Sequence, residues 1–171
     1  MPDTLPRHEA DSVLHSWCVP ALWDAPTVVG GAGAWLHLAD GRRILDLSSL
    51  SECSLLGHQH PRLVAAIQQQ AQALCFVTNQ WGAQVRAELA EELLAVSGLQ
   101  GGRVFFTLGG ADANENAVKI ARLASDLPRG AVIARERSYH GASTMGMALS
   151  GDARVQAFVD AQALGVHHVP P

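Results

Sequence analysis

The sequence predicts an α/β fold, in which a parallel-rich sheet with flanking helices follows an N-terminal arm and a small antiparallel unit. Two observations predict it. After residue 103, strand patterns alternate with helical patterns, which is the order that builds a parallel sheet. Between residues 27 and 47, short β-rich stretches are separated by Gly-Gly and Asp-Gly turn signals. We therefore expect the arm and small β unit in residues 1–60 and the first, incomplete part of a larger domain in residues 61–171.

The composition restricts the class of function. The chain has 171 residues, of which 48% are apolar and 16% charged, as in globular proteins. A net charge of −4 argues against a nucleic-acid partner, because no Lys/Arg-rich stretch could neutralise phosphates. No apolar run reaches the length of a signal peptide or of a membrane span. We expect a cytoplasmic protein without a membrane partner.

The cysteines and histidines do not indicate a metal site. Cys18, Cys53 and Cys75 lie far apart without Cys-x-x-Cys spacing, so we expect reduced thiols. The histidine pairs at 58/60 and 167/168 have no carboxylate or cysteine at metal-ligand spacing. No metal is expected.

The N-terminal part begins with an arm, residues 3–24, in which we expect a short helix followed by irregular chain. Strands are predicted at residues 27–29, 34–38 and 44–47. The stretch Gly31-Ala32-Gly33 hints at a dinucleotide-binding loop. However, Leu36 stands where the third glycine should be and no helix follows, so this interpretation is rejected.

The remaining chain alternates helices and strands. Pro61 suits the first turn of a helix that continues to Leu74, and Gly98 is a usual helix stop. Further helices are predicted at residues 84–96, 111–124 and 153–164, and strands at residues 104–107, 131–134 and 166–169. The chain stops at Pro171, in the middle of the expected sheet.

Two segments could carry chemistry. Gly109, Gly110 and Ala111 join a predicted strand to a helix, where free N–H groups and the helix dipole can bind a phosphate. The same pattern also fits an ordinary tight turn of an α/β protein. Tyr139-His140-Gly141 follows the next strand, where ligands of parallel sheets bind, and an aromatic ring there could stack on a planar cofactor. A plain aromatic plug at the sheet end is the alternative.

A long stretch, Val104-Phe105-Phe106-Thr107-Leu108-Gly109-Gly110-Ala111-Asp112-Ala113-Asn114-Glu115-Asn116-Ala117-Val118-Lys119-Ile120-Ala121-Arg122, resembles a motif of the class III aminotransferases. Four shorter matches occur in the family's order: Asp40–Leu47, Leu56–Pro61, Ser138–Ser143 and Leu149–Asp152. The resemblance covers residues 12–171. It implies the fold type I large domain, a homodimer, and pyridoxal 5'-phosphate (PLP) as the cofactor, with an amine or ω-amino acid and a keto acid as substrates.

The resemblance also implies roles for individual residues. Gly110 and Ala111 would offer backbone N–H groups to the PLP phosphate, Gly109 would shape the turn, and Tyr139 would stack on the pyridine ring. His140 and Gly141 belong to the same motif. The family often has Ser at the positions of Gly109 and Ala111, and Asn at Leu108, so this chain would rely more on backbone donors. Ser51, Glu52 and Cys53 would border the substrate entrance.

Lys119 is the only lysine, although a PLP aminotransferase needs a lysine that bonds the cofactor. The helical phase predicts that Ala113, Ala117, Ile120, Ala121 and Ala124 are buried. The opposite face, which holds Asp112, Glu115, Asn116, Lys119, Arg122 and Asp126, is then solvated, with a Glu115–Lys119 pair on it. Lys119 is therefore not expected to be catalytic, and the chain alone is expected to be poorly stable and inactive. Two alternatives stay open: a non-catalytic module that binds phosphate or a partner, and a class III relative with racemase, decarboxylase or aminomutase chemistry.

Overall fold

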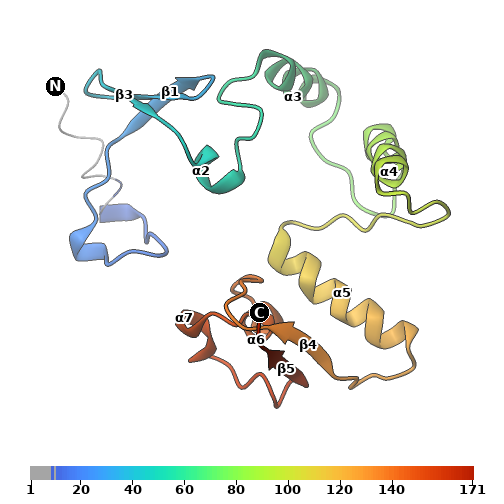
Figure 1. Cartoon of the computed structure of the whole chain (residues 1–171). Helices are drawn as coiled ribbons and strands as arrows, with labels where there is room; N and C mark the ends of the chain where they lie inside the picture. Colours follow the sequence, from blue (N-terminus) through green and yellow to red (C-terminus); the bar gives the residue numbers. More distant parts are fainter. Residues whose placement is uncertain (1–8, 10) are drawn as a thin grey trace. The chain divides into compact units, whose positions relative to one another are not determined.

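The computed structural model describes residue 9 and residues 11–171, so the start of the predicted arm lies outside the described residues. The described chain forms two compact units, one up to Gly82 and one from Ala83 to Pro171 (Figure 1). The predicted domain boundary after residue 60 stays a prediction. Within the arm, a short 3-10 helix, η1, spans Pro20–Leu22.

The first unit contains the small antiparallel sheet that the sequence predicts. Strands β1 (Val28–Ala32), β2 (Trp35–Leu38) and β3 (Arg43–Leu45) are adjacent in the order β1-β2-β3, and both pairings are antiparallel. Gly33 and Gly41, with φ of +57° and +86°, form the turns between them. The stretch Gly31–Gly33 thus belongs to a hairpin and not to a strand–helix turn of the kind that a dinucleotide-binding loop needs.

The rest of this unit contains one long helix and one short turn-like segment. Helix α3 spans Pro61–Ala73 and begins at the proline, as predicted. Between the sheet and α3, the short segment α2 (Ser49–Glu52) was not predicted. It is not a right-handed helix, because φ is positive at all four of its residues. Helix α3 has no buried residue, so its predicted apolar positions are uncovered in this unit.

The second unit begins with helix α4 (Gln84–Ser97), which ends at Gly98 with a left-handed φ of +70°, as the sequence predicts. The predicted strand at residues 104–107 is wrong, since these residues pair with no strand among the described residues. A strand needs a neighbour for its backbone N–H and C=O groups, and the apolar pattern alone cannot supply one. Helix α5 (Gly110–Ala124) follows, close to its predicted bounds.

Strands β4 (Val132–Arg135) and β5 (Val166–Val169) form a parallel pair, which confirms the predicted parallel sheet. Between them lie helix α6 (Thr144–Leu149), which was not predicted, and helix α7 (Ala153–Gln156). The prediction of one helix over residues 153–164 is therefore wrong. After Gln156 the chain turns repeatedly so that Val159, Ala161 and Leu164 pack on the core. That core is formed by Val118, Ala134, Ala148, Leu149 and Val166.

The predicted buried face of α5 is also wrong. Ala113, Ala117, Ala121 and Ala124 are exposed, and Ile120 is 52% exposed. The helix instead turns Val118 and Arg122 toward β4 and β5. Arg122 donates from Nε to the carbonyl oxygen of Gly130 (3.1 Å) and from Nη2 to that of Leu164 (2.8 Å), just before each strand begins. A cationic side chain therefore fixes the starts of both parallel strands.

Candidate functional site

The phosphate turn, defined here as Gly109–Ala111, begins helix α5. Gly109 is the N-cap residue and is fully extended (φ 177°, ψ 178°), with no side chain capping the helix. The first N–H groups of a helix have no partner within it, and they carry the positive end of the helix dipole. A Cβ added at Gly109 or Gly110 would have no atom within 4 Å. The turn is thus open enough for an anion to approach the backbone.

The carboxylate of Asp112 is held beside the turn by two hydrogen bonds. Its Oδ2 accepts a hydrogen bond from the backbone N–H of Leu108 (3.3 Å), and its Oδ1 accepts one from Asn116 Nδ2 (2.9 Å). Thr107 Oγ1 donates to the carbonyl oxygen of Gly109 (3.2 Å), which fixes the extended approach to the helix. The local sequence therefore shapes the turn before any ligand is present.

The aromatic segment, defined here as Tyr139–Gly141, lies after β4. Ser138 Oγ donates to the carbonyl oxygen of Arg135 (2.6 Å), which turns the chain at the end of that strand. Tyr139 is 51% exposed, and His140 and Gly141 are half-buried. Gly141 has a φ of +114°, a conformation that favours glycine.

The structure brings the two predicted segments together. An ideal Cβ on Gly141 would lie 2.5 Å from the Cβ of Ala111, so only glycine permits this approach. Five of the six residues predicted from the sequence therefore lie around the N-terminal part of α5: Gly109, Gly110, Ala111, His140 and Gly141. The sixth, Tyr139, directly precedes His140 in the chain.

Three polar residues that were not predicted to belong to the site hold this arrangement. Asn114 Nδ2 donates to the carbonyl oxygen of His140 (2.9 Å), and the backbone N–H of His140 donates to Ser150 Oγ (2.9 Å). Glu115 Oε1 accepts from the backbone N–H of Met145 (2.9 Å), which ties α5 to α6. Two signals in the sequence could have identified Asn114 and Ser150. Asparagine is a poor helix former, so its presence in the second turn of a predicted helix is unusual, and Ser150 lies in one of the matched motifs.

Lys119 is exposed, as predicted, but the predicted Glu115–Lys119 pair is wrong, because Glu115 bonds to Met145 instead. Lys119 lies nine residues after Gly110, which places it roughly 13 Å along the helix axis from the phosphate turn.

Arg154 and Asp152 form an exposed ion pair in the same unit. Arg154 Nε lies 3.0 Å from both carboxylate oxygens of Asp152. Hydrogen bonds from the Arg154 side chain and backbone lower the pKa of Asp152 below its ordinary value of 3.8. The pKa of Arg154 is raised, first by Asp152 and to a smaller extent by Tyr139, so a positive charge lies within electrostatic reach of the Tyr139 phenol.

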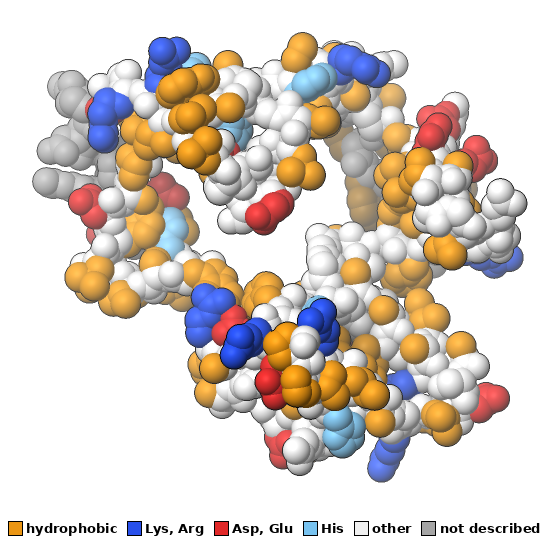
Figure 2. Space-filling view, viewed as in Figure 1, with side chains coloured by type: hydrophobic (Ala, Val, Ile, Leu, Met, Phe, Trp, Pro, Cys, Tyr) orange, Lys and Arg blue, Asp and Glu red, His pale blue; other side chains and the backbone are white. Residues whose placement is uncertain are grey.

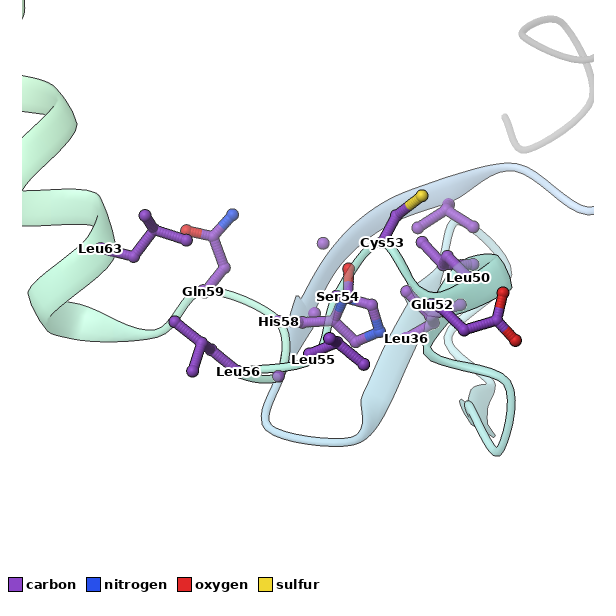
Figure 3. A pocket seen from close by; sticks show the side chains of 14 residues that line it. Leu36, Leu50, Glu52, Cys53, Ser54, Leu55, Leu56, His58, Gln59 and Leu63 are labelled. Carbon is purple, nitrogen blue, oxygen red and sulfur yellow. The ribbon is translucent and has the colours of Figure 1, made fainter. Parts of the chain in front are cut away.

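A hollow of about 570 Å³ lies in the first unit (Figure 3). Leu50, Glu52 and Cys53 of the α2 region line it together with residues of β1, β2 and the chain that leads into α3. The prediction that Ser51, Glu52 and Cys53 border a substrate entrance stays a prediction, although two of these residues line a hollow. Beside it, Asp46 Oδ2 and His58 Nε2 are 2.9 Å apart, with side chains only 5% and 10% exposed.

Among the described residues, no three His, Cys, Asp or Glu side chains gather as metal ligands would. Cys18, Cys53 and Cys75 are exposed free thiols. Within the same residues, no helix is both long and apolar enough to cross a membrane.

Comparison with known proteins gives consistent relatives. The model of the family "Aminotransferase class-III" matches residues 24–171. Acetylornithine aminotransferase of Nitrosomonas europaea is 37% identical over 150 residues, which cover 84% of this chain and 37% of that protein. The enzyme of the same name from Mycolicibacterium smegmatis is 37% identical over 158 residues, covering 92% of this chain and 38% of its own length. The chain thus spans less than two fifths of these relatives.

Solved structures agree with the predicted architecture. Taurine:2-oxoglutarate aminotransferase of Bifidobacterium kashiwanohense, solved with PLP and glutamate, has a TM-score of 0.85 and 34% identity, covering 95% of this chain and 36% of that one. An adenosylmethionine-8-amino-7-oxononanoate aminotransferase of Methanocaldococcus jannaschii has a TM-score of 0.89 at 24% identity, over 98% of this chain and 40% of its own, and supports the fold alone. The expected fold type I PLP-transferase architecture is confirmed. Because the family model matches most of its length and relatives exceed 30% identity, this chain belongs to the class III aminotransferases.

Proposed function

We propose that this chain is the N-terminal part of a PLP-dependent aminotransferase, and that its phosphate turn and aromatic segment bind the cofactor. The observation that carries the proposal is the approach of Gly141 to Ala111, with 2.5 Å between an ideal Cβ and the Cβ of Ala111. PLP carries its phosphate on a short arm of its pyridine ring. A site for it therefore needs an anion-binding turn and a ring-binding side chain close together, and this unit has both.

The residues present fit this group. Open backbone at Gly109 and Gly110 leaves room for phosphate oxygens at a helix N-terminus. Tyr139, which is half-exposed and directly precedes His140 in the chain, would provide an aromatic face for the ring. The family often has Asn at the position of Leu108 and Ser at the positions of Gly109 and Ala111. Without those side chains, backbone N–H groups would be the main hydrogen-bond donors to the phosphate.

When bound, PLP supplies the electron sink through which an amino group leaves a donor and enters a keto acid. This chain's residues would bind the phosphate, cover one face of the ring and hold both in register. The lysine that bonds the cofactor would come from chain that follows Pro171, since Lys119 is exposed and distant along α5. We propose that turnover requires that part and that the 171 residues alone are inactive.

The substrates are proposed from the relatives. Taurine and acetylornithine, named in two of them, share a reacting amine at the end of a short chain that also bears an acidic group. We propose a donor of this class, an amine or ω-amino acid, and a keto acid acceptor. We propose a homodimer from the family resemblance, and a cytoplasmic location as the sequence analysis expects.

The test removes one phosphate donor without removing the helix. Gly110 is the first residue of α5, a position that tolerates proline, and the extended Gly109 before it suits a following proline. In the complete protein, Gly110→Pro should leave the unfolding midpoint nearly unchanged. A hydrogen bond to a charged group contributes about 1.5–3 kcal/mol, so PLP affinity should fall roughly tenfold or more. Pyridoxal, which lacks the phosphate, should be little affected.

Gln84→Pro is the matched control, because Gln84 is the first residue of α4 and also follows an extended residue. It should not change PLP affinity. Equal PLP affinity for Gly110→Pro and the unchanged protein would contradict the phosphate site. Absence of amine-to-keto-acid transfer by the complete, PLP-loaded protein would contradict the proposed reaction.

A further inference from the structure

The aromatic segment is held by more than its contact with Ala111. Its middle residue, His140, has both of its backbone polar groups bonded to side chains from other elements. The carbonyl oxygen accepts from Asn114 Nδ2 of α5 (2.9 Å), and the N–H donates to Ser150 Oγ at the end of α6 (2.9 Å). Two independent elements therefore fix one residue of the segment.

The Ser150 anchor is rigid. Ser150 is fully buried, and its hydroxyl donates to the carbonyl oxygen of Gly146 (2.7 Å), so the hydroxyl proton is committed and its lone pairs face His140. Gly146 and Gly151 keep this region close-packed. A Cβ on Gly146 would lie 3.0 Å from the carbonyl oxygen of His140, and one on Gly151 would overlap the backbone at Arg135 and Glu136. Little space remains for Ser150 to move.

Asn114 connects the two halves of the proposed site. It lies on α5, four residues after Gly110, and so belongs to the same rigid helix whose first N–H groups form the phosphate turn. Its amide reaches across to the carbonyl oxygen of His140, one residue after the proposed ring-stacking Tyr139. Any displacement of the aromatic segment relative to the phosphate turn must break this bond or the contact between Gly141 and Ala111.

We propose that Asn114 and Ser150 are positioning residues, which hold Tyr139 at a fixed distance and angle from the phosphate turn. The proposal rests on the proposed PLP site. Neither side chain needs to touch the cofactor. Binding groups must be held within about 0.5 Å to be effective, and a backbone anchored on both sides of His140 provides this for Tyr139.

The test uses the complete protein with Asn114→Ala and Ser150→Ala, singly and together. Each change leaves one backbone group of His140 without its partner. We expect each to weaken PLP binding roughly three- to tenfold and to alter the induced circular dichroism of the bound cofactor, which reports ring orientation. Because both act on one residue, the double variant should lose less than the product of the single losses.

Gln70→Ala is the control. Its side-chain amide, like that of Asn114, donates to a backbone carbonyl oxygen, that of Leu74 (2.9 Å), but it lies on α3 of the first unit, which contains neither the phosphate turn nor the aromatic segment. It should leave both readouts unchanged. If Ser150→Ala fails to fold, Asn114→Ala decides alone, because Asn114 is only half-buried.

Failure of the positioning role and failure of the proposed function would give different results. If the unchanged protein binds PLP, and Asn114→Ala lowers only the unfolding temperature while PLP affinity and circular dichroism stay the same, the positioning role is overturned. If the unchanged protein does not bind PLP, the proposed function itself is overturned, and the positioning role with it.

Discussion

Asp46 shows how one carboxylate can organise a loop. It accepts from the backbone N–H and hydroxyl of Ser48 and from the N–H of Leu50, and it is bonded to His58. Burial acts to raise the pKa of Asp46, but the hydrogen bonds from Leu50, Ser48 and His58 outweigh it and hold the pKa below 3.8. These bonds favour the ionised form, so they link the stability of the loop to pH.

A depressed pKa in the folded state contributes stability above the unfolded value, and this contribution is lost as pH falls through the folded pKa. Asp46→Asn should therefore lower the urea midpoint of the complete protein at pH 7, and the difference from wild type should narrow from about pH 5 downward. Glu92→Gln, an exposed carboxylate on α4, controls for the loss of one charge. A difference that stays constant down to pH 3 would contradict a pH-linked role for Asp46.

At the scale of elements, α2 is the segment that Asp46 holds. Ser49, Leu50, Ser51 and Glu52 have φ of 50°, 46°, 58° and 64°, a left-handed turn built without glycine. Each such residue costs about 1–2 kcal/mol, so the turn persists only because its surroundings, including the bonds to Asp46, enforce it. Strain of this kind concentrates at functional sites, and Leu50 and Glu52 line the 570 Å³ hollow (Figure 3).

The strain predicts an unusual response to glycine. Ser51→Gly should raise the free energy of unfolding by roughly 0.5–1 kcal/mol, because glycine adopts φ near +58° without a Cβ clash. The same change at exposed Gln69, inside α3, should lower it by about 1 kcal/mol. Denaturant titration of the two variants in the complete protein compares them. A loss of stability with Ser51→Gly would show that the turn is not left-handed in solution.

The elements that the sequence could predict are those with local signals. Pro61, Gly98 and the Gly-rich turns mark the start of α3, the end of α4 and the hairpin between β1 and β2. The segment at residues 104–107 could not be assigned correctly, because pairing depends on a distant strand. Segment α2 contains no glycine, so nothing in its sequence indicates positive φ. The buried face of α5 failed because Glu115 and Arg122 use their polar ends on backbone groups, which periodicity cannot show.

The candidate site also has parts with local sequence signals and parts that depend on distant contacts. The phosphate turn and aromatic segment are contiguous motifs, so their residues were predictable. Asn114 and Ser150 act over 26 and 10 residues, and only the folded chain shows that they meet at His140.

At the scale of the whole molecule, the described chain buries little. Its accessible surface is 13511 Å². A compact protein of 18.1 kDa exposes roughly 8,100 Å², and two separate domains of half that mass would together expose roughly 9,700 Å². The excess therefore does not depend on how the two units are arranged. Apolar side chains are spread over the visible surface (Figure 2), and helices α3 and α4 contain no buried residue.

This exposure predicts how the 171-residue polypeptide behaves by itself. With Leu93, Phe105 and Ile133 at 40%, 65% and 72% exposure, it should bind a hydrophobic dye strongly, self-associate, and melt without a cooperative transition. The complete protein, in which further chain and a second subunit would cover these faces, should bind little dye and melt cooperatively. Dye fluorescence, sedimentation and calorimetry on the two polypeptides measure the contrast. A 171-residue chain that is monomeric and melts in one sharp transition would contradict this prediction. Uncovered apolar surface on this scale favours self-association of the chain over the monomeric state.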